Sequence, residues 1–176
     1  MTTLAGGNAL STFRAQQLQP ALEAIHPRIS GIAARFVHLV ATDAAPTPTE
    51  LERLAALLTY GDPYVGPGDG TVLIVTPRLG TLSPWASKAT DIARNCGLAL
   101  RRVERTTEYR ISLKSGLLGR APELTAEQLG QIAALLHDRM TESVVADRSA
   151  ASALFTELQP APMEHVDVLA GGRAAL

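Results

Sequence analysis

The sequence predicts an α+β protein, a compact sandwich in which one sheet packs against helices. Segments with helical periodicity alternate along the chain with strand-like segments, and that order alone would favour a parallel α/β sheet. Two further observations favour α+β instead. Few strands are predicted, and the last of them, residues 102–113, alternates so regularly that one face is mostly apolar and the other is charged. A strand with one wet face is typical of antiparallel pairing.

The composition indicates an ordinary globular protein. The 176 residues are 46% hydrophobic and 19% charged, which fits one soluble domain plus an appendage. The net charge of −1 gives no indication of a nucleic-acid partner. The apolar runs are shorter than a membrane span, and the N-terminal residues do not resemble a secretory signal. Since a single cysteine permits no internal disulfide, we expect a cytoplasmic location.

The first predicted elements are a helix and a strand. Asn8 or Ser11 caps a helix whose apolar positions are Leu10, Phe13, Leu18 and Leu22. Pro20 either divides this helix or begins a second short one as its first residue. Residues 32–41 are apolar with β-branched and aromatic members, which predicts a strand.

The second helix has a clear start signal. Thr47 and Glu50 form a capping box around Pro48, the first helical residue. The apolar positions then follow at one-sided helical spacing: Leu51, Leu54, Ala55 and Leu58. We expect Gly61 to provide the C-terminal cap.

Residues 61–70, GDPYVGPGDG, are rich in turn formers. Their glycines invite a phosphate-loop interpretation, but no Gly-Lys-Ser/Thr follows, and a strand rather than a helix comes next. We therefore interpret this segment as a flexible connection. Residues 71–76, TVLIVT, are predicted to be a short buried strand.

The third helix carries both the only tryptophan and the only cysteine. Ser83 caps it, Pro84 is its first residue and Gly97 ends it. One stripe contains Trp85, Ala89, Ile92, Ala93 and Cys96. We expect Trp85 and Cys96 to pack beneath the helix, with Cys96 a buried structural thiol because no basic partner marks it as a nucleophile.

The long strand and the last helix complete the predicted domain. In the strand, Arg105 shares the apolar face with Val103, Thr107, Tyr109, Ile111 and Leu113. The other face, predicted to be wet, carries Arg102, Glu104, Thr106, Glu108 and Arg110. TAEQ at 125–128 is a second capping box, and its helix carries Leu129, Ile132, Ala133, Leu136 and Met140. After Asp147 the pattern loosens: ASALFTEL is a candidate short helix, and the apolar end suggests a chain cut from something longer.

No catalytic constellation is recognisable. The four histidines lack the spacing of a metal site, so we expect no bound metal, and His137 near the end of the last helix is interpreted as structural. One group suggests anion or interface contacts at the start of the Trp85 helix: Arg78, Thr81, Ser83, Ser87 and Lys88. The plain interpretation, an ordinary capped helix with exposed charges, is favoured in the absence of context.

Several long motifs resemble one enzyme family. They are ALSTFRAQQL at 9–18, LLTYGDP, TPRLGTLSPWASKATDIARNCGL, ELTAEQLGQIAALLHDRMTESV and VDVLAGGRAAL at 166–176. In the same order and with similar spacing, they resemble the N-terminal region of the large single-chain bacterial phosphoribosylformylglycinamidine synthases. The resemblance runs from about residue 8 to the last residue. Residues 115–122 depart from it, being longer than the usual turn of the family.

The resemblance implies a part of a ligase and glutamine amidotransferase. The full enzyme makes formylglycinamidine ribonucleotide from formylglycinamide ribonucleotide, glutamine and ATP in purine biosynthesis. Its ATP- and magnesium-binding synthase region and its glutaminase would lie beyond residue 176, so we expect no catalytic residue and no cofactor in this segment, which would be inactive alone. Residues 1–147 would form the N-terminal domain, similar in fold to a dimer of the small separate subunit of multi-subunit versions. Residues 148–176 would begin the linker toward the synthase domain.

The resemblance also implies a role. In this family the N-terminal domain contacts the synthase and glutaminase parts and helps form the ammonia path between them. The loop from Arg78 to Ser87 would then face the synthase region, as a domain interface in preference to a substrate-phosphate site. The alternative function is a free-standing small-molecule regulatory domain that dimerises through its sheet. A complete small enzyme has no catalytic constellation to support it.

Overall fold

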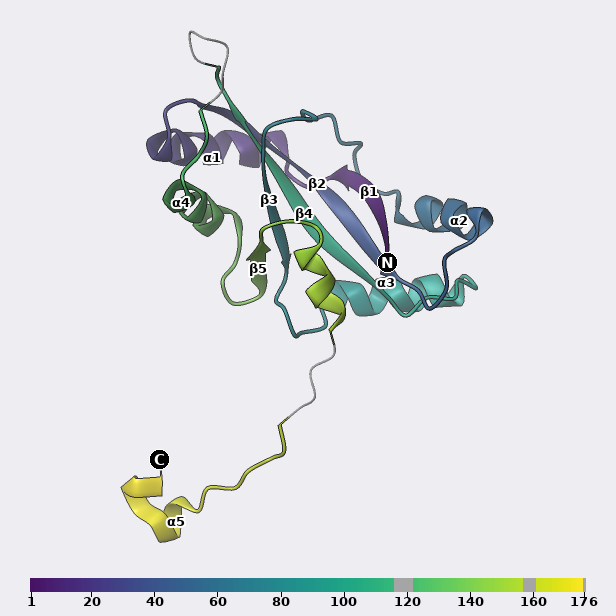
Figure 1. Ribbon diagram of the computed structural model, residues 1–176, viewed down its shortest axis with the longest axis vertical. Helices are drawn as coiled ribbons and strands as arrows, with labels where there is room; N and C mark the ends of the chain where they lie inside the picture. The colour runs from purple at the N-terminus through teal and green to yellow at the C-terminus, as the bar shows by residue number, and fades with distance from the viewer. Residues whose placement is uncertain (116–121, 157–160, 176) are drawn as a thin grey trace.

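The computed structural model describes residues 1–115, 122–156 and 161–175 and confirms the α+β class (Figure 1). Five antiparallel strands form one sheet in the order β1-β2-β4-β3-β5. Their bounds are β1 Thr2–Asn8, β2 Ile29–Ala41, β3 Thr71–Pro77, β4 Arg102–Leu113 and β5 Glu142–Val145. The antiparallel pairing predicted for β4 is therefore confirmed. The two longest strands, β2 and β4, pair along their whole length at the centre.

The two outer strands were not predicted from the sequence. β1 contains two glycines and β5 has only four residues, so neither carries a long alternating pattern. Both lie at the edges of the sheet, where β1 pairs with β2 and β5 pairs with β3. Each edge strand is held by the backbone of a longer neighbour, which is a relationship between distant segments and leaves little local signal.

The four main helices are those predicted, with some changes at their ends. Their bounds are α1 Thr12–Ile25, α2 Pro48–Leu58, α3 Pro84–Asn95 and α4 Ala126–Leu136. Ser11, not Asn8, caps α1, and Pro20 lies inside a single continuous helix, so the predicted division at Pro20 is wrong. Both predicted capping boxes are present in α2 and α4. Helix α4 ends at Leu136 and does not extend to Met140, because His137 adopts an extended backbone conformation.

Glycine behaves differently at the ends of α2 and α3. After α3, Gly97 has φ of 74° and its amide donates to Arg94 O, while the amide of Leu98 donates to Ala93 O. This is the Schellman arrangement, and the predicted stop at Gly97 is confirmed. After α2 the capping position is Thr59 in an extended conformation, so Gly61 lies beyond the cap and was wrongly assigned to it.

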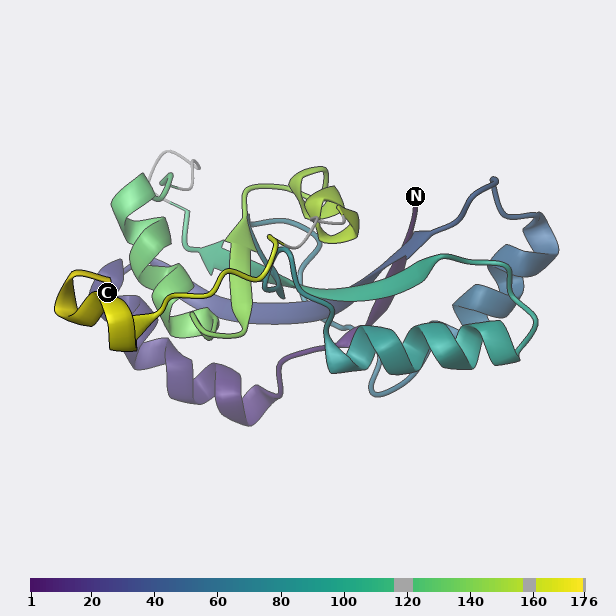
Figure 2. The same cartoon turned by 90° about the horizontal axis from the view of Figure 1, so that it is seen from below.

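The helices cover one face of the sheet in two groups. α1 and α4 pack on one end of that face, over a cluster that includes Ile32, Leu73 and Ile111. α2 and α3 pack on the other end, over a second cluster that includes Val40 and Val103. Figure 2 shows α1 and α3 on the same side of the sheet. The two clusters leave a strip of sheet between them.

The opposite face corrects one prediction. Glu104 and Glu108, expected on a wet face, are 0% and 2% exposed. Residues 148–155, here called the C-terminal strap, lie across this face, with Ala151 and Leu154 packed on Val37, Leu39 and Ile74. The alternation of apolar and charged side chains along β4 shows which residues share a face. It does not show that the strap, a later segment, covers one of those faces. Figure 2 shows the 3₁₀ helix of the strap, Ala150–Phe155, on the side of the sheet opposite α1 and α3.

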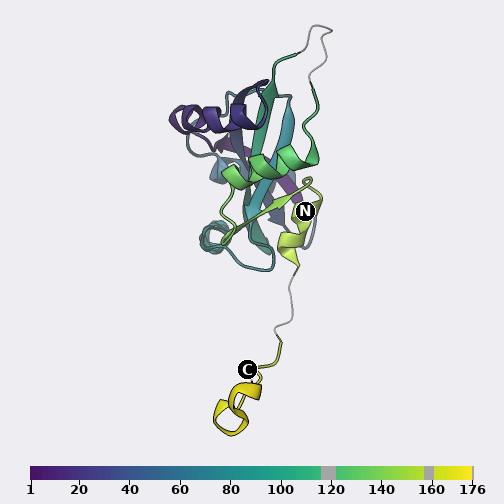
Figure 3. The same ribbon diagram turned by 90° about the vertical axis from the view of Figure 1, so that its left-hand side faces the viewer.

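The segments after the strap lie apart from the sheet. A short helix α5, Val168–Gly171, and a 3₁₀ turn, Gly172–Ala175, follow residues 161–167 (Figure 3). The candidate helix ASALFTEL is a 3₁₀ helix over residues 150–155, and its last residues lie outside the described part of the chain. Most of the long turn at 115–122 also lies outside it. The domain boundary at 147 stays a prediction, although the strap that follows it packs on the sheet.

Candidate functional site

The strip between the two helix groups is lined by polar and aromatic side chains. Along β2, Ala34 belongs to one hydrophobic cluster and Val40 to the other. Side chains alternate between the faces of a strand, so Phe36 and His38 lie on the same face between them. Arg105 of β4 lies opposite His38 in the sheet register. The strip thus places an arginine among aromatic rings at the centre of the covered face.

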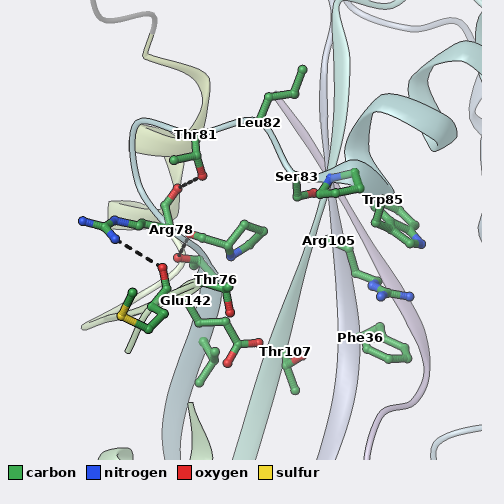
Figure 4. Close-up of a pocket in the computed structure, with 15 residues that line it drawn as sticks. Phe36, Thr76, Arg78, Thr81, Leu82, Ser83, Trp85, Arg105, Thr107 and Glu142 are labelled. Atoms are coloured by element: carbon green, nitrogen blue, oxygen red, sulfur yellow. Dashed lines mark hydrogen bonds between the residues drawn. The ribbon is translucent and has the colours of Figure 1, made fainter. Parts of the chain in front are cut away.

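An open pocket of about 490 Å³ lies over part of this strip (Figure 4). Three of the predicted site residues line it, namely Arg78, Thr81 and Ser83, and so does Trp85. Figure 4 shows Arg78 and Glu142 on one wall, and Trp85, Arg105 and Phe36 on the facing wall. The remaining lining residues are Val75, Thr76, Pro77, Leu82, Pro84, Thr107, Met140 and Thr141. We call it the central pocket.

The polar groups of the loop before α3 are used within the protein. Arg78 donates from Nη1 to Met140 O at 3.2 Å and from its amide to Thr141 O at 2.9 Å. The hydroxyl of Thr81 donates to Arg78 O at 2.6 Å. Ser83 Oγ accepts the amide of Ala86 at 3.0 Å, as predicted for the helix cap. These bonds fasten the loop to the β5 side of the pocket and leave it few free donors.

The other two predicted site residues do not line the central pocket. The hydroxyl of Ser87 donates to Ser83 O at 3.3 Å within the first turn of α3. Lys88 lines a separate hollow of about 200 Å³ between α2 and α3, where Trp85 forms part of the wall. The five residues are therefore not one anion site in this structure.

Helix α3 is rotated relative to the predicted stripe. Its buried residues are Ala86, Thr90 and Ala93, and Thr90 Oγ1 accepts the amide of Val103 at 3.0 Å. The two small alanines allow the helix to lie close to β4. Consequently Cys96 is exposed, and its predicted burial is wrong. Trp85 is half-buried and packs against the α2–α3 cluster, so its predicted packing is confirmed.

Arg105 lies between two aromatic rings. Its guanidinium carbon is 4.3 Å from the ring centre of Phe36 and 4.6 Å from that of Trp85. Its Nη1 also donates to the hydroxyl of Tyr60 at 3.2 Å. Stacking on two π faces fixes the plane of the guanidinium and is favourable for a cation. Within residues 1–115, 122–156 and 161–175, no carboxylate lies within 4.0 Å of Arg105.

Comparison with protein families bears on this region. Residues 35–155 match the family described as "Formylglycinamide ribonucleotide amidotransferase N-terminal". The chain belongs to this family. The match covers the whole central pocket and ends at Phe155, the last residue of the 3₁₀ helix in the strap. The resemblance to the N-terminal domain of phosphoribosylformylglycinamidine synthase, an amidotransferase of purine biosynthesis, is thereby confirmed.

His38 of this amidotransferase N-terminal domain is buried beside Arg105. Its ring stacks on Trp85 with centroids 5.6 Å apart, and Nε2 shares a hydrogen bond with the hydroxyl of Tyr60 at 2.8 Å. Burial, and secondarily the charge of Arg105, lowers the pKa of His38 to about 4. The imidazole is therefore neutral at neutral pH, and Arg105 is the cation of this strip.

Sequence reasoning missed Phe36, His38, Tyr60 and Arg105 as members of the site. Two signals were present: a histidine inside the apolar run of β2, and an arginine sharing a face with Val103. Both are polar groups at positions where the alternation demands burial, and such positions are commonly functional. The sequence did not show that the two residues are opposite each other, because that depends on the register of β2 on β4.

The described residues of the amidotransferase N-terminal domain offer no metal site. Among residues 1–115, 122–156 and 161–175, no group of three or more histidine, cysteine, aspartate or glutamate side chains is arranged to hold a metal ion. Within the same residues, no helix is both long and apolar enough to cross a membrane.

Proposed function

We propose that this domain is the non-catalytic scaffold and coupling domain of phosphoribosylformylglycinamidine synthase. It contacts the synthase and glutaminase parts of the same enzyme and helps form the path for ammonia between them. The observation that carries the proposal is the apolar rim of the central pocket within a chain of this family. Two large side chains that line the pocket, Leu82 and Met140, are 55% and 73% exposed, and Leu79 on the same loop as Leu82 is 40% exposed. Gathered apolar side chains beside a pocket are typical of a protein interface.

The loop from Arg78 to Ser87 is the proposed contact with the synthase region. Its hydroxyls and its arginine are engaged in internal hydrogen bonds, which suits a rigid surface that another domain packs against. A phosphate site would need several convergent free donors. The interface role is therefore favoured over a substrate-phosphate role for Arg78, Thr81, Ser83, Ser87 and Lys88.

A rigid wall suits ammonia transfer for a chemical reason. Ammonia is readily protonated in neutral water, so a path between two active sites must exclude bulk solvent. The long paired strands β2 and β4, covered by helices on one face and by the strap on the other, provide a stiff body for that purpose. Such a body can act without performing chemistry. The ATP and magnesium of the reaction, and its location in the cytoplasm, are proposed for the complete enzyme.

A second candidate function follows from the pocket itself. A free-standing regulatory domain would bind a small molecule in a hollow of this size, about 490 Å³, and would dimerise through its sheet. The structure gives one reason to place this second. Helices cover much of one face of the sheet and the strap covers part of the other, which leaves less of the sheet open to another copy.

Complementation tests the coupling role. The 176-residue chain is mixed with a synthase that lacks this region, and turnover with glutamine is compared with turnover with added ammonia. Restored glutamine-dependent turnover is expected. Absence of both binding and restoration would remove the support for coupling and favour the regulatory alternative.

A matched pair of variants locates the contact. In the full-length enzyme Arg78→Ala loosens the loop that we place at the interface, and we expect a lower ratio of glutamine-dependent to ammonia-dependent turnover. The control is Arg101→Ala, an exposed arginine just before β4 that does not line the pocket and lies 4.0 Å from Asp43. Equal ratios in the two variants would argue against a role for the 78–87 loop.

A further inference from the structure

We propose that Arg105 is a receptor for one carboxylate group carried by the adjoining part of the enzyme. This inference deepens the proposed coupling function and rests on it. The carboxylate would enter the central pocket and pair with the guanidinium between Phe36 and Trp85. Arg105 would thus anchor the domain to its neighbour through a single charged contact within an apolar surface.

The charge of Arg105 is unmatched, unlike that of the arginines on the other face. There Arg35, Arg110 and Arg148 all pair with Glu108, and Arg102 pairs with Glu104. Arg105 is the arginine of β4 that faces the helices, and no described carboxylate is within 4.0 Å of it. A half-buried cation without a counter-charge is complementary to an acidic group on a partner.

The surroundings of Arg105 hold it ready for a planar anion. The rings of Phe36 and Trp85 at 4.3 and 4.6 Å restrict the orientation of the guanidinium, and the hydroxyl of Tyr60 occupies one edge. A guanidinium offers five N–H donors in a fixed fork that matches the two oxygens of a carboxylate. Because the fork is already oriented, little side-chain entropy is lost when the pair forms.

The pocket favours a singly charged carboxylate over a phosphate. Two nearby donors are engaged elsewhere: Nη1 of Arg78 bonds Met140 O, and the hydroxyl of Thr76 bonds Pro77 O at 2.9 Å. Arg78 and Glu142 line the opposite wall with charges of opposite sign, so together with Arg105 the hollow has one unbalanced positive charge. One unbalanced positive charge, on an oriented guanidinium, suits a monoanion.

The occupant we favour is a side chain of a protein surface. The exposed side chains of Leu82 and Met140, which line the pocket, would lose contact with water only beneath a body larger than a metabolite. An aspartate or glutamate flanked by apolar residues has the matching pattern. Residues that dominate the binding energy of interfaces are enriched in arginine and tryptophan and are surrounded by contacts that exclude water.

The only tryptophan of the chain provides a direct assay. Trp85 stacks on Arg105, so its fluorescence reports on anything that pairs with the guanidinium. The probe is sodium propionate, titrated into the 176-residue chain at constant ionic strength against sodium chloride. We expect a saturable change in emission in the millimolar range, weakened at least tenfold in Arg105→Met and unchanged in Arg101→Met. The proposal would be overturned if propionate changed the emission no more than chloride does. It would also be overturned if propionate changed the emission of Arg105→Met as much as that of the unmodified chain. A tighter response to inorganic phosphate than to propionate would also overturn it.

Binding to the remainder of the enzyme separates this inference from the coupling role. If the unmodified chain binds the synthase lacking this region, Arg105→Met is expected to weaken the complex at least tenfold and Arg105→Lys to restore only part of the loss. If Arg105→Met binds as tightly as the unmodified chain, the proposed role of Arg105 is contradicted and the coupling function is not. Failure of the unmodified chain to bind would sink the coupling function, and the propionate titration would still decide the chemistry of Arg105.

Discussion

Arg148 of the strap donates from Nε to Oε2 of Glu108 in the central strand at 2.8 Å, joining residues forty positions apart. Arg35 bonds the other oxygen of the same carboxylate at 2.9 Å, and Arg110 bonds it at 2.8 Å. Burial acts to raise the pKa of Glu108, but the hydrogen bonds and charges of Arg148 and Arg35 outweigh it, and the pKa lies below its ordinary value. One buried carboxylate therefore holds three arginines and fastens the strap to the sheet.

Replacing that carboxylate by an amide tests its importance. Glu108→Gln leaves three guanidinium groups without their counter-charge on a buried face, and we expect the free energy of unfolding to fall by about 3 kcal/mol. Chemical denaturation measures it, with Glu52→Gln on the exposed side of α2 as the control. Because the folded pKa of Glu108 is depressed, its stabilisation is full above the ordinary value of 4.5 and is lost as the pH falls through the folded pKa. Equal stability of the two variants would show that the cluster does not hold the strap.

Two truncations test where the domain ends. A chain of residues 1–156 keeps the strap, whereas a chain of residues 1–147 loses Arg148, Ala151 and Leu154 together. Loss of a buried leucine side chain alone costs about 2–5 kcal/mol, and Leu154 is 2% exposed. We expect the shorter chain to unfold at a clearly lower denaturant concentration than the longer one. Identical midpoints would support the predicted boundary at 147.

The buried histidine makes stability depend on pH. The pKa of His38 is lowered from 6.5 to about 4 in the folded chain, so the unfolded chain binds a proton more readily. The folded state therefore loses stability as the pH falls from about 6.5 to about 4, by about 3 kcal/mol at most. Unfolding free energies across this range measure the slope, which should flatten in His38→Gln. An equal slope in that variant would contradict the assignment.

A pair of glycine substitutions tests packing over the same histidine. A Cβ on Gly6 of β1 would lie 2.6 Å from Cε1 of His38 and 3.0 Å from Cβ of Phe36. We expect Gly6→Ala to destabilise the chain by about 1–3 kcal/mol, because the crowded ring is itself buried. Gly130→Ala, in α4 with open space around it, should stabilise by about 0.5–1 kcal/mol. The unfolding temperatures of both variants test this. A stabilising effect of Gly6→Ala would mean that the His38 ring can move away from the added methyl group.

Local signals predicted most of the helical framework. The two capping boxes, Ser83 before Pro84 and Gly97 after α3 all lie where the sequence placed them, because each acts within a few residues. Three strands were predicted at nearly their observed positions. The predicted division of α1 at Pro20 failed, because a helix packed on a sheet can retain an interior proline that would break an isolated helix.

The candidate site was predicted in part. The start of α3 was recognised from its polar residues and from Trp85, and three of those residues do line the central pocket. The facing wall was missed because Phe36 and Arg105 come from separate segments, as does Tyr60, which bonds Arg105. The predicted stripe of α3 failed at Cys96, since a stripe defines which residues share a side but not how far the helix turns toward the sheet.

By itself the sequence determined the family, the α+β class, most of the helix starts and the two faces of the long strand. These features follow from motifs, periodicity and short-range hydrogen bonds, all of which depend on residues close together in the sequence. Only the tertiary structure decided that Arg105 stands between Phe36 and Trp85, and that the strap covers Glu104 and Glu108. The physical reason is that burial and charge pairing depend on strand register and on segments that return from far along the chain. A charged face is wet or buried according to what folds over it.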